Sequence, residues 1–382
     1  MKSLKIGLLG FGSMGKTHAF SLSALPYYYD NLDFCASYGA VCTSHVESAH
    51  IAAKKYSLGF ATVNEDEIIY NPEIDIIDIC TPNINHYESI KKAILAGKHV
   101  LCEKPLTVTV EQAVELDTLA KDAFTKNGQV CGMVFNNRHL AAVRRAKELI
   151  DGGRLGRIVS FDFKYLHNTC LDPDRTAGWK QDRNVCGAGT LFDLGSHAVD
   201  LCRYLCGEFS EVFAKEQIVF PTHKKTDGSI WQTNADEAAY MIATLTCGAV
   251  GNITVGKINI GENDGLTFSV YGTEGAIRFD LMESDWLWFY DGKDEGGNFG
   301  GERGYKKLEC VGRYPSPAGK FPSPKAQNGW LRGHIASMYS YLSAVNNSVH
   351  ASPSFEDGAR VQTVLDAAHR SHTEGRVIKI IE

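Results

Sequence analysis

A glycine-rich turn near the start of the chain has the residue types and spacing of a phosphate-binding loop. This turn, Gly10-Phe11-Gly12-Ser13-Met14-Gly15, follows the apolar run Ile6–Leu9 and precedes a stretch that favours a helix. Gly10 allows a tight turn, Gly12 lets the backbone approach a pyrophosphate, and Gly15 lets the helix and strand pack closely. The helix N-terminus would then present free N–H groups to the anion. The pattern alone is weak evidence, but its place after a first strand favours nucleotide binding over a plain structural turn.

Further polar residues follow the apolar runs that we interpret as strands. In open α/β sheets, ligands bind beyond the carboxyl ends of the strands, so the residues after each run are candidates for a binding site. These residues are Thr43, Ser44 and His45, then Thr81, Pro82, Asn83 and His86, then Glu103, Lys104 and Pro105, and finally Asn136, Asn137 and Arg138. We expect their side chains to converge on one edge of a sheet.

The first third of the chain has the alternating rhythm of strands and helices. Strands are expected at Ile6–Leu9, Phe34–Cys42, Ile74–Cys80, His99–Cys102 and Val130–Phe135, and helices at Val46–Tyr56, His86–Ala96 and Val110–Phe124. This βαβ order predicts a parallel sheet with crossover helices. We assign residues 1–135 to a dinucleotide-binding domain.

The remaining residues, 136–382, form a second domain with a different pattern. Strand-like runs at Arg157–Tyr165, Ser210–Phe220, Glu237–Thr246, Ala249–Ile260, Leu266–Tyr271, Ala276–Asp280 and Asp285–Tyr290 are separated by turn signals. They predict a large, mostly antiparallel open sheet with one face covered by helices. Asp291–Pro324 is expected to be a long loop, and Trp330–Val345 and Phe355–Gly375 to be two late helices.

Composition restricts the class of protein. The chain has 382 residues, 44% hydrophobic and 22% charged, which is typical of a soluble globular protein with two domains. The net charge of −6 gives no reason to expect nucleic acid or a membrane as partner. No apolar run approaches the roughly 20 residues of a membrane span. The 11 cysteines are scattered, without a C-x-x-C pair, which favours reduced thiols in the cytoplasm over a zinc site.

Four motifs together resemble the Gfo/Idh/MocA oxidoreductases, a family that includes glucose–fructose oxidoreductase and inositol dehydrogenase. They are the glycine turn continued through Lys16-Thr17-His18-Ala19, Thr81-Pro82-Asn83 with His86, Glu103-Lys104-Pro105, and Gly189–Asp200 with its D-x-G-x-H-x-x-D pattern. The resemblance implies a Rossmann domain, a C-terminal α/β domain, and NAD(P)-linked oxidation or reduction of a sugar or cyclitol. It also implies a homo-oligomer, a dimer or tetramer formed through the C-terminal sheet.

The chemistry of such a reaction suits three residues of the chain. Oxidation of a secondary alcohol sends hydride to the nicotinamide and the hydroxyl proton to a base. His197 is a suitable base because imidazole titrates near neutrality. Asp193 lies four residues earlier and would share a helix face with His197, and Lys104 supplies a positive charge where an alkoxide develops. By resemblance, Lys104, Asp193 and His197 are catalytic, and this chemistry requires no metal.

Other candidates rest on position alone. The residues expected to contact substrate are Lys104, Arg138, Trp179, Arg183, Asp193 and His197. Those expected to contact the cofactor are Gly10, Phe11, Gly12, Ser13, Met14, Gly15, Thr43, Ser44, Thr81, Pro82, Asn83, His86, Glu103 and Lys104. For Asp200 we expect a structural ion pair rather than an interaction with His197. His334 and His369 are interpreted as surface or packing residues.

The second strand departs from the usual NAD pattern. An acidic residue normally ends this strand and binds the ribose hydroxyls, but Thr43 stands there. Asp33 has roughly the right spacing from the glycines but precedes the strand. The missing carboxylate favours NADP, or use of both cofactors, although no arginine stands beside Thr43 to bind a 2′-phosphate.

Two alternative functions remain open from the sequence. One is a catalytically silent regulator that senses a sugar or cofactor, although the presence of Lys104, Asp193 and His197 favours an enzyme. The other is a reductase of a keto-sugar or of an aromatic dihydrodiol. The sequence names neither the sugar nor the direction of the reaction.

Overall fold

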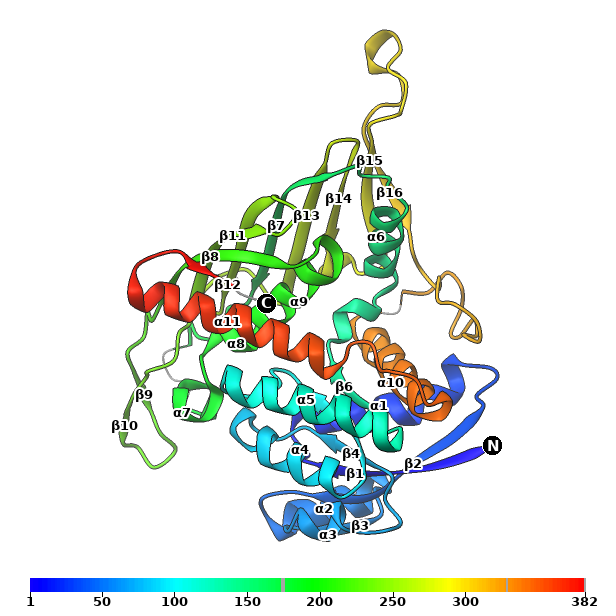
Figure 1. Cartoon of the computed structure of the whole chain (residues 1–382), viewed down its shortest axis with the longest axis vertical. Helices are drawn as coiled ribbons and strands as arrows, with labels where there is room; N and C mark the ends of the chain where they lie inside the picture. Colours follow the sequence, from blue (N-terminus) through cyan, green and yellow to red (C-terminus); the bar gives the residue numbers. More distant parts are fainter. Residues whose placement is uncertain (173–175, 328, 381–382) are drawn as a thin grey trace. The chain divides into compact units, whose positions relative to one another are not determined.

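The computed structural model describes residues 1–172, 176–327 and 329–380, which form two compact units (Figure 1). The first unit contains Met1–Asn136, Tyr314–Pro324 and Leu331–Gln362, and the second contains Asn137–Arg313, Lys325–Trp330 and Thr363–Glu382. Two segments of the range 136–382, Tyr314–Pro324 and Leu331–Gln362, thus pack with the first unit, and the division of the chain into domains at 1–135 and 136–382 stays a prediction. Among the described residues, no helix has the length and apolar character needed to cross a membrane.

The first unit is built on a parallel sheet of six strands in the order β3-β2-β1-β4-β5-β6. The strands are β1 (Lys2–Leu9), β2 (Phe34–Cys42), β3 (Phe60–Thr62), β4 (Ile76–Ile79), β5 (His99–Glu103) and β6 (Cys131–Val134). The helices between them are α1 (Ser13–Tyr28), α2 (Val46–Tyr56), α3 (Asp66–Ile69), α4 (His86–Leu95) and α5 (Val110–Asn127). This strand order is that of the doubly wound dinucleotide-binding fold.

Local sequence signals set the helix ends in this unit. Helix α5 begins after Thr109, whose side chain accepts a hydrogen bond from the backbone N–H of Gln112. It ends at Gly128, which has a φ of 69°, a left-handed conformation that favours glycine at helix C-termini. The crossover helix thus starts and stops where the sequence supplies a cap.

Helix α10 (Gly329–Asn347) explains why the chain returns to the first unit. Its buried residues Ile335, Met338, Tyr341, Leu342 and Val345 join one hydrophobic cluster with apolar residues of β1, among them Leu4, Ile6 and Leu8. Burial of apolar surface contributes roughly 25 cal/mol per Å², so this shared core binds the late segment firmly to the early sheet. The second late helix, α11 (Phe355–Glu374), follows it.

The second unit is built on a sheet of nine strands in the order β16-β15-β14-β13-β7-β12-β11-β8-β17. Its strands are β7 (Ile158–Leu166), β8 (Phe209–Gln217), β11 (Ala238–Leu245), β12 (Val250–Gly256), β13 (Gly265–Gly272), β14 (Gly275–Asp280), β15 (Trp286–Asp291), β16 (Tyr305–Glu309) and β17 (Ile378–Lys379). All neighbours in this sheet pair antiparallel except β7 and β12, which run parallel. This one parallel pair brings two strand carboxyl ends to the same edge.

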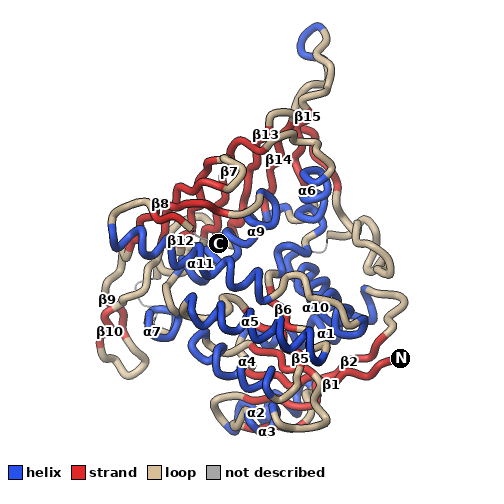
Figure 2. The backbone as a smooth tube through the Cα atoms, viewed as in Figure 1, coloured by secondary structure: helices blue, strands red, loops and turns tan. Residues whose placement is uncertain are grey.

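Helices α6 (Ala141–Asp151), α8 (Thr190–Asp193) and α9 (Gly195–Cys206) pack on this sheet (Figure 2). Helix α9 contacts β7 and β12, and α6 contacts β14 and β15. The strands alternate accordingly: Val212, Ala214 and Glu216 of β8 are buried, whereas Phe213 and Lys215 between them are exposed. A separate hairpin joins β9 (Thr222–Lys224) and β10 (Ile230–Gln232).

The region expected to be a long loop, Asp291–Pro324, is the main secondary-structure error. It contains β16, which pairs antiparallel with β15 and places Tyr305 opposite Tyr290. The sequence Tyr-Lys-Lys-Leu-Glu is polar and does not alternate, because it forms an edge strand whose side chains are exposed or half-buried. Helix α6 and strands β3 and β17 were also not predicted.

Candidate functional site

The glycine turn has the geometry of an anion-binding loop. Gly10 has a φ of 90°, and a Cβ there would lie 2.6 Å from the carbonyl oxygen of Cys80, so only glycine fits. A Cβ at Gly15 would lie 2.3 Å from the carbonyl oxygen of Gly10. A Cβ at Gly12, by contrast, would meet no atom of the described residues within 4 Å. Gly12 is also the N-cap of α1. Because glycine has no side chain to cap the first N–H groups of the helix, these groups can bind an anion, and the turn fits a dinucleotide pyrophosphate.

Behind this turn, His18 of α1 lies in a buried network of charged groups. Its Nδ1 is 2.9 Å from Oδ1 of Asp78, and its Nε2 is 3.1 Å from Oε1 of Glu103. Burial lowers the pKa of His18, but the charges of Asp78 and Cys80 and the hydrogen bonds to them together outweigh burial, and the pKa lies well above its ordinary value. Both ring nitrogens therefore donate to carboxylates.

The same region also has a spacing that could hold a metal ion. Ligand atoms of His18, Asp78 and Cys80 all lie within 4.8 Å of one another. Tyr38 donates a hydrogen bond to Oδ2 of Asp78 at 2.7 Å, and burial raises the pKa of the Cys80 thiol to about 12. A neutral thiol and an imidazole held by two carboxylates form a complete hydrogen-bonded network, so we assign this group to structure rather than to metal binding.

The Glu-Lys-Pro turn leaves β5 next to this network. Glu103 is buried, and although burial raises its pKa, His18 and Lys104 lower it to about 2. Its Oε2 accepts a hydrogen bond from the backbone N–H of Lys104 at 3.2 Å. The carboxylate of Glu103 therefore holds the turn that carries Lys104, and Lys104 itself is half-buried.

His86 braces two strand ends. Its ring nitrogens lie 2.9 Å from the carbonyl oxygen of Pro105 and 3.0 Å from that of Thr81, and its side chain is fully buried. Burial lowers its pKa below the ordinary value. His86 thus positions the loops after β4 and β5, and direct contact with a cofactor stays a prediction. We call Gly10, Gly12, Thr81 and Lys104, whose contact with a cofactor stays a prediction, the cofactor-binding edge.

Thr43 directly follows β2, as expected. Its hydroxyl donates to the carbonyl oxygen of His45 at 2.9 Å and lies 2.6 Å from Oγ of Ser48. Ser44 and His45 are exposed. Asp33 lies at the opposite end of β2, where its carboxylate accepts a hydrogen bond from Asn346. Asp33 therefore does not take the place of the missing ribose ligand.

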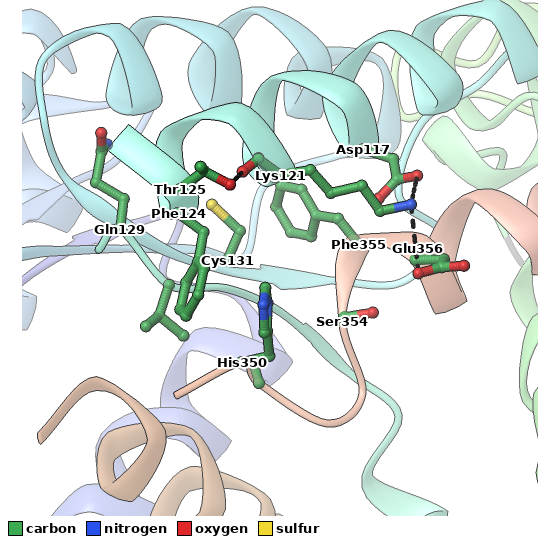
Figure 3. A pocket seen from close by; sticks show the side chains of 13 residues that line it. Asp117, Lys121, Phe124, Thr125, Gln129, Cys131, His350, Ser354, Phe355 and Glu356 are labelled. Carbon is green, nitrogen blue, oxygen red and sulfur yellow. Dashed lines mark hydrogen bonds and ion pairs between the residues drawn. The ribbon is translucent and has the colours of Figure 1, made fainter. Parts of the chain in front are cut away.

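A pocket of about 420 Å³ lies at the other edge of the first sheet (Figure 3). It is lined by the C-terminal half of α5, by Gln129 and Cys131 at the amino end of β6, and by His350 and Glu356. Figure 3 shows Lys121 directed to Asp117 and Glu356, with which its ammonium forms ion pairs at 2.9 and 3.3 Å. Because nucleotides bind at strand carboxyl ends, this pocket is separate from the cofactor-binding edge.

In the second unit, the parallel pair β7 and β12 gathers polar side chains at its carboxyl ends. His167 follows β7, and Asp264 precedes the antiparallel β13 at the same edge. Oδ1 of Asp264 accepts from Tyr165 at 2.7 Å and lies 3.0 Å from Nε2 of His167. The ring of His197, in α9, meets the ring of Tyr165 edge-on, with 5.8 Å between centroids. His197 thus belongs to a polar cluster and not to an apolar core.

Asp193, at the end of α8, is held by two lysines. Its Oδ2 lies 2.6 Å from Nζ of Lys257 and 2.7 Å from Nζ of Lys180. Leu194 has helical dihedral angles and joins α8 to α9, so Asp193 and His197 lie on successive helical segments. We call Tyr165, His167, Asp193, His197, Lys257 and Asp264 the acid–base cluster.

Asp236 fastens the segment that precedes Asp193. Its two carboxylate oxygens accept from the backbone N–H groups of Gly189 and Leu191, both at 2.7 Å. A Cβ at Gly189 would lie 1.9 Å from the carbonyl oxygen of Asp236, so the approach requires glycine. Burial and the nearby charge of Glu216 raise the pKa of Asp236 to about 6.

Two predicted substrate residues take part in ion pairs. Arg138 donates to both oxygens of Asp200, at 2.8 and 2.5 Å, which gives Asp200 the structural role that we expected. Arg183 donates to Glu216 at 2.9 Å, and His369 lies 2.6 Å from the same carboxylate. His369 is therefore part of an ion cluster rather than a surface residue. Contact of Arg138 and Arg183 with substrate stays a prediction.

One predicted substrate residue, Trp179, and four residues that the sequence did not predict complete the site. Trp179 is partly exposed, in a single 3-10 turn. Lys257, Tyr165, Asp264 and Asp236 were not predicted. Lys257 directly follows β12 in the structure, but the strand-like run of the sequence, Ala249–Ile260, extends past it. The sequence therefore did not mark Lys257 as a residue at a strand end.

Comparison with known proteins matches both units. A model of the family described as an oxidoreductase family with an NAD-binding Rossmann fold matches residues 4–133, and its C-terminal alpha/beta domain matches residues 147–380. The chain is 31% identical to levoglucosan dehydrogenase of Pseudarthrobacter phenanthrenivorans, over 96% of this chain and 95% of that protein. It is 27% identical to glucose-6-phosphate 3-dehydrogenase of Bacillus subtilis, over 95% and 94%.

Solved structures agree with these relatives. A levoglucosan dehydrogenase in complex with NADH and levoglucosan has a TM-score of 0.93 to this chain at 30% identity, with each chain covered over its full length. The glycine turn, the Glu-Lys-Pro turn and the D-x-G-x-H segment all fall within the matched ranges. The chain therefore belongs to the Gfo/Idh/MocA oxidoreductase family and is an NAD(P)-dependent enzyme.

Proposed function

We propose that this chain oxidises a secondary alcohol of an uncharged sugar or anhydrosugar, with NAD or NADP as the hydride acceptor. The observation that supports this proposal is the acid–base cluster, in which His197 and Asp193 lie beside the carboxyl ends of the one parallel strand pair. The presence of both residues argues against a catalytically silent regulator. The relative that shares the most sequence among those above is a levoglucosan dehydrogenase, which makes levoglucosan the first substrate to test.

The proposed mechanism assigns one role to each of three residues. A bound nicotinamide supplies the hydride acceptor. The imidazole of His197 accepts the hydroxyl proton, and the ammonium of Lys104 stabilises the developing alkoxide. The carboxylate of Asp193 accepts a hydrogen bond from a neighbouring hydroxyl and thereby orients the sugar. That Lys104 acts on the same substrate as the acid–base cluster rests on the resemblance to the family.

The charges of the second unit favour a neutral substrate over a sugar phosphate. Lys180 and Lys257 are paired with Asp193, His167 with Asp264, and Arg183 with Glu216. The phosphate group of a substrate would have to compete with these carboxylates for the lysine, histidine and arginine side chains. We therefore expect the chain to differ in substrate from its relative that is named for glucose 6-phosphate.

An assay of the purified full chain tests the substrate. Levoglucosan, glucose, glucose 6-phosphate and an inositol are each incubated with NAD and with NADP, and absorbance is followed at 340 nm. We expect turnover of an uncharged sugar and at least tenfold lower kcat/KM with glucose 6-phosphate. Preference for the phosphate would overturn the proposal of a neutral substrate, and no turnover of any sugar would favour the regulator.

We also propose a homo-oligomer that forms through the outer face of the second sheet. Phe213, Ile242 and Tyr240 are exposed on this face, and Phe213 pairs with Ile242 across β8 and β11. Val250 and Trp288 extend the same exposed apolar surface. Ile242→Lys should reduce the mass measured by light scattering to that of a monomer. Tyr70→Lys, at an exposed position of the first unit, is the control and should leave the mass unchanged.

The cysteines support a location in the cytoplasm. Seven of the 11 cysteines are buried, and the described cysteines carry thiols rather than disulfides. Free thiols persist in reducing compartments, whereas secreted proteins commonly form disulfides. Fractionation of cells that produce the protein, followed by immunoblotting, tests this location.

A further inference from the structure

Lys257 is a nearly buried lysine that contacts the proposed catalytic carboxylate. Its side chain is 10% exposed, and its Nζ lies 2.6 Å from Oδ2 of Asp193. Lys180 reaches the same oxygen at 2.7 Å, but its side chain is 42% exposed and extends from a single 3-10 turn. One carboxylate oxygen thus receives two ammonium groups from very different environments.

The backbone of Lys257 is fixed on both sides. Its N–H donates to the carbonyl oxygen of Glu237 at 2.8 Å, and its carbonyl oxygen accepts from the N–H of Cys170 at 2.8 Å. Lys257 also follows β12, which is a central strand of the nine-stranded sheet. A charge on such a rigid element can define the position of Asp193 more accurately than a charge on a surface turn.

The electrostatic surroundings keep Lys257 charged. Burial lowers the pKa of Lys257, but the charge and the hydrogen bond of Asp193, together with Cys170 and Asp236, outweigh burial, and the pKa lies above its ordinary value of 10.5. Cys170 and Asp236 are the other titratable groups that act on it. An adjacent cation in turn favours the ionised form of a carboxyl group. Solvent screens the exposed ammonium of Lys180, so Lys180 stabilises the ionised carboxyl group of Asp193 less than Lys257 does.

We propose that Lys257 is a positioning residue of the reaction, which keeps the carboxylate of Asp193 ionised and aligned to accept a hydroxyl of the sugar. The proposal rests on the proposed function, since it assigns a role in that same site. It distinguishes Lys257, as a built-in partner of Asp193, from Lys180, whose exposed ammonium makes only an additional contact.

The first experiment replaces Lys257 with methionine, which has a similar length but no charge. With levoglucosan and NAD, Lys257→Met should lower kcat/KM at least tenfold and shift the acid limb of its pH profile to higher pH. Lys257→Arg keeps the charge and should restore the pH profile. Lys180→Met should reduce kcat/KM less than Lys257→Met does. Lys126→Met, at an exposed position of α5 and paired with Asp122, is the matched control and should leave the kinetics unchanged.

Unchanged kcat/KM and an unchanged pH profile in Lys257→Met would overturn the proposal. Inactivity of the wild-type chain with every sugar would instead contradict the proposed function. A second measurement therefore needs no substrate: a double-mutant cycle of Lys257→Met and Asp193→Asn by urea unfolding. We expect the double variant to lose less stability than the sum of the two single losses. Strict additivity would overturn the pairing, and if Lys257→Met does not fold, Lys257→Gln replaces it in both measurements.

Discussion

Nε2 of His18 lies 3.1 Å from the carboxylate of Glu103, so the helix that begins at the glycine turn is tied to the end of β5, directly before Lys104. Both side chains are buried, and the second nitrogen of His18 is held by Asp78. The imidazolium thus connects three elements: α1, β4 and β5. The loop that fits a pyrophosphate and the lysine proposed to stabilise an alkoxide share one rigid support.

His18→Gln should therefore destabilise the chain strongly. The change leaves two buried carboxylates without their cation, and breaking a buried ion pair in this way costs about 3–5 kcal/mol. Urea unfolding at pH 7 measures the loss. His50→Gln, at an exposed position of α2, is the control and should change the free energy of unfolding by less than about 0.5 kcal/mol. A loss below about 1 kcal/mol for His18→Gln would show that the network is not held by charge.

Gly12→Val should abolish binding of the dinucleotide without disturbing the fold. A side chain at Gly12 meets no described atom within 4 Å, so it would occupy the space that the pyrophosphate needs. Fluorescence titration with NADH and NADPH should show no saturable binding, while the melting temperature stays close to that of the wild type. Gly10→Ala is the contrasting variant, since its Cβ would clash with the Cys80 carbonyl, and it should lower the melting temperature. Retained NADH affinity in Gly12→Val would show that the glycine turn does not bind the pyrophosphate.

His197→Ala and Lys104→Ala should abolish turnover and leave cofactor affinity nearly intact. Loss of a general base typically lowers the rate by about 10²–10⁴-fold. Steady-state kinetics with levoglucosan and fluorescence titration with NADH separate the two effects. A near-normal kcat in His197→Ala would remove this residue as the base.

The elements that the sequence predicted well are those with a strong local signal. The apolar run of β2 and the amphipathic pattern of α2 predicted their bounds, Phe34–Cys42 and Val46–Tyr56. The spacing of the glycines predicted the turn between β1 and α1. Strand β16 was missed because an exposed edge strand carries no hydrophobic alternation.

The site was less predictable, because its residues meet through pairings that are distant in sequence. Asp193 and Lys257 are 64 residues apart, and His18 and Glu103 are 85 residues apart. No local pattern encodes such contacts. The return of α10 to the first unit has the same origin, since an amphipathic helix shows which face is buried but not which sheet receives it.

Thr43→Asp should increase the preference for NAD over NADP. The carboxylate would stand at the end of β2, where it can accept hydrogen bonds from ribose hydroxyls and repel a 2′-phosphate. A charge-assisted hydrogen bond contributes roughly 1.5–3 kcal/mol, so the ratio of kcat/KM for the two cofactors should rise at least about tenfold. Both cofactors are compared on one substrate, with Ser44→Asp as the neighbouring control. A flat ratio would mean that Thr43 does not face the ribose.

The raised pKa of Asp236 predicts a specific pH dependence of stability. Burial and the charge of Glu216 raise this pKa from 3.8 to about 6 in the folded chain. A raised pKa means that the folded state binds the proton more tightly than the unfolded state does. The resulting stabilisation is complete below pH 3.8 and is lost as the pH rises through about 6.

Asp236→Asn removes this titration, so the free energy of unfolding of the wild type minus that of the variant should increase as the pH falls from 7 to 4. About two pKa units correspond to a change on the order of 3 kcal/mol. Urea unfolding of both proteins at pH 7, 6, 5 and 4 measures the difference, and groups that titrate alike in the two proteins cancel from it. A constant difference across this range would show that the ionised carboxylate is fully stabilised by the N–H groups of Gly189 and Leu191. Asp236 would then hold the segment before Asp193 equally well at every pH.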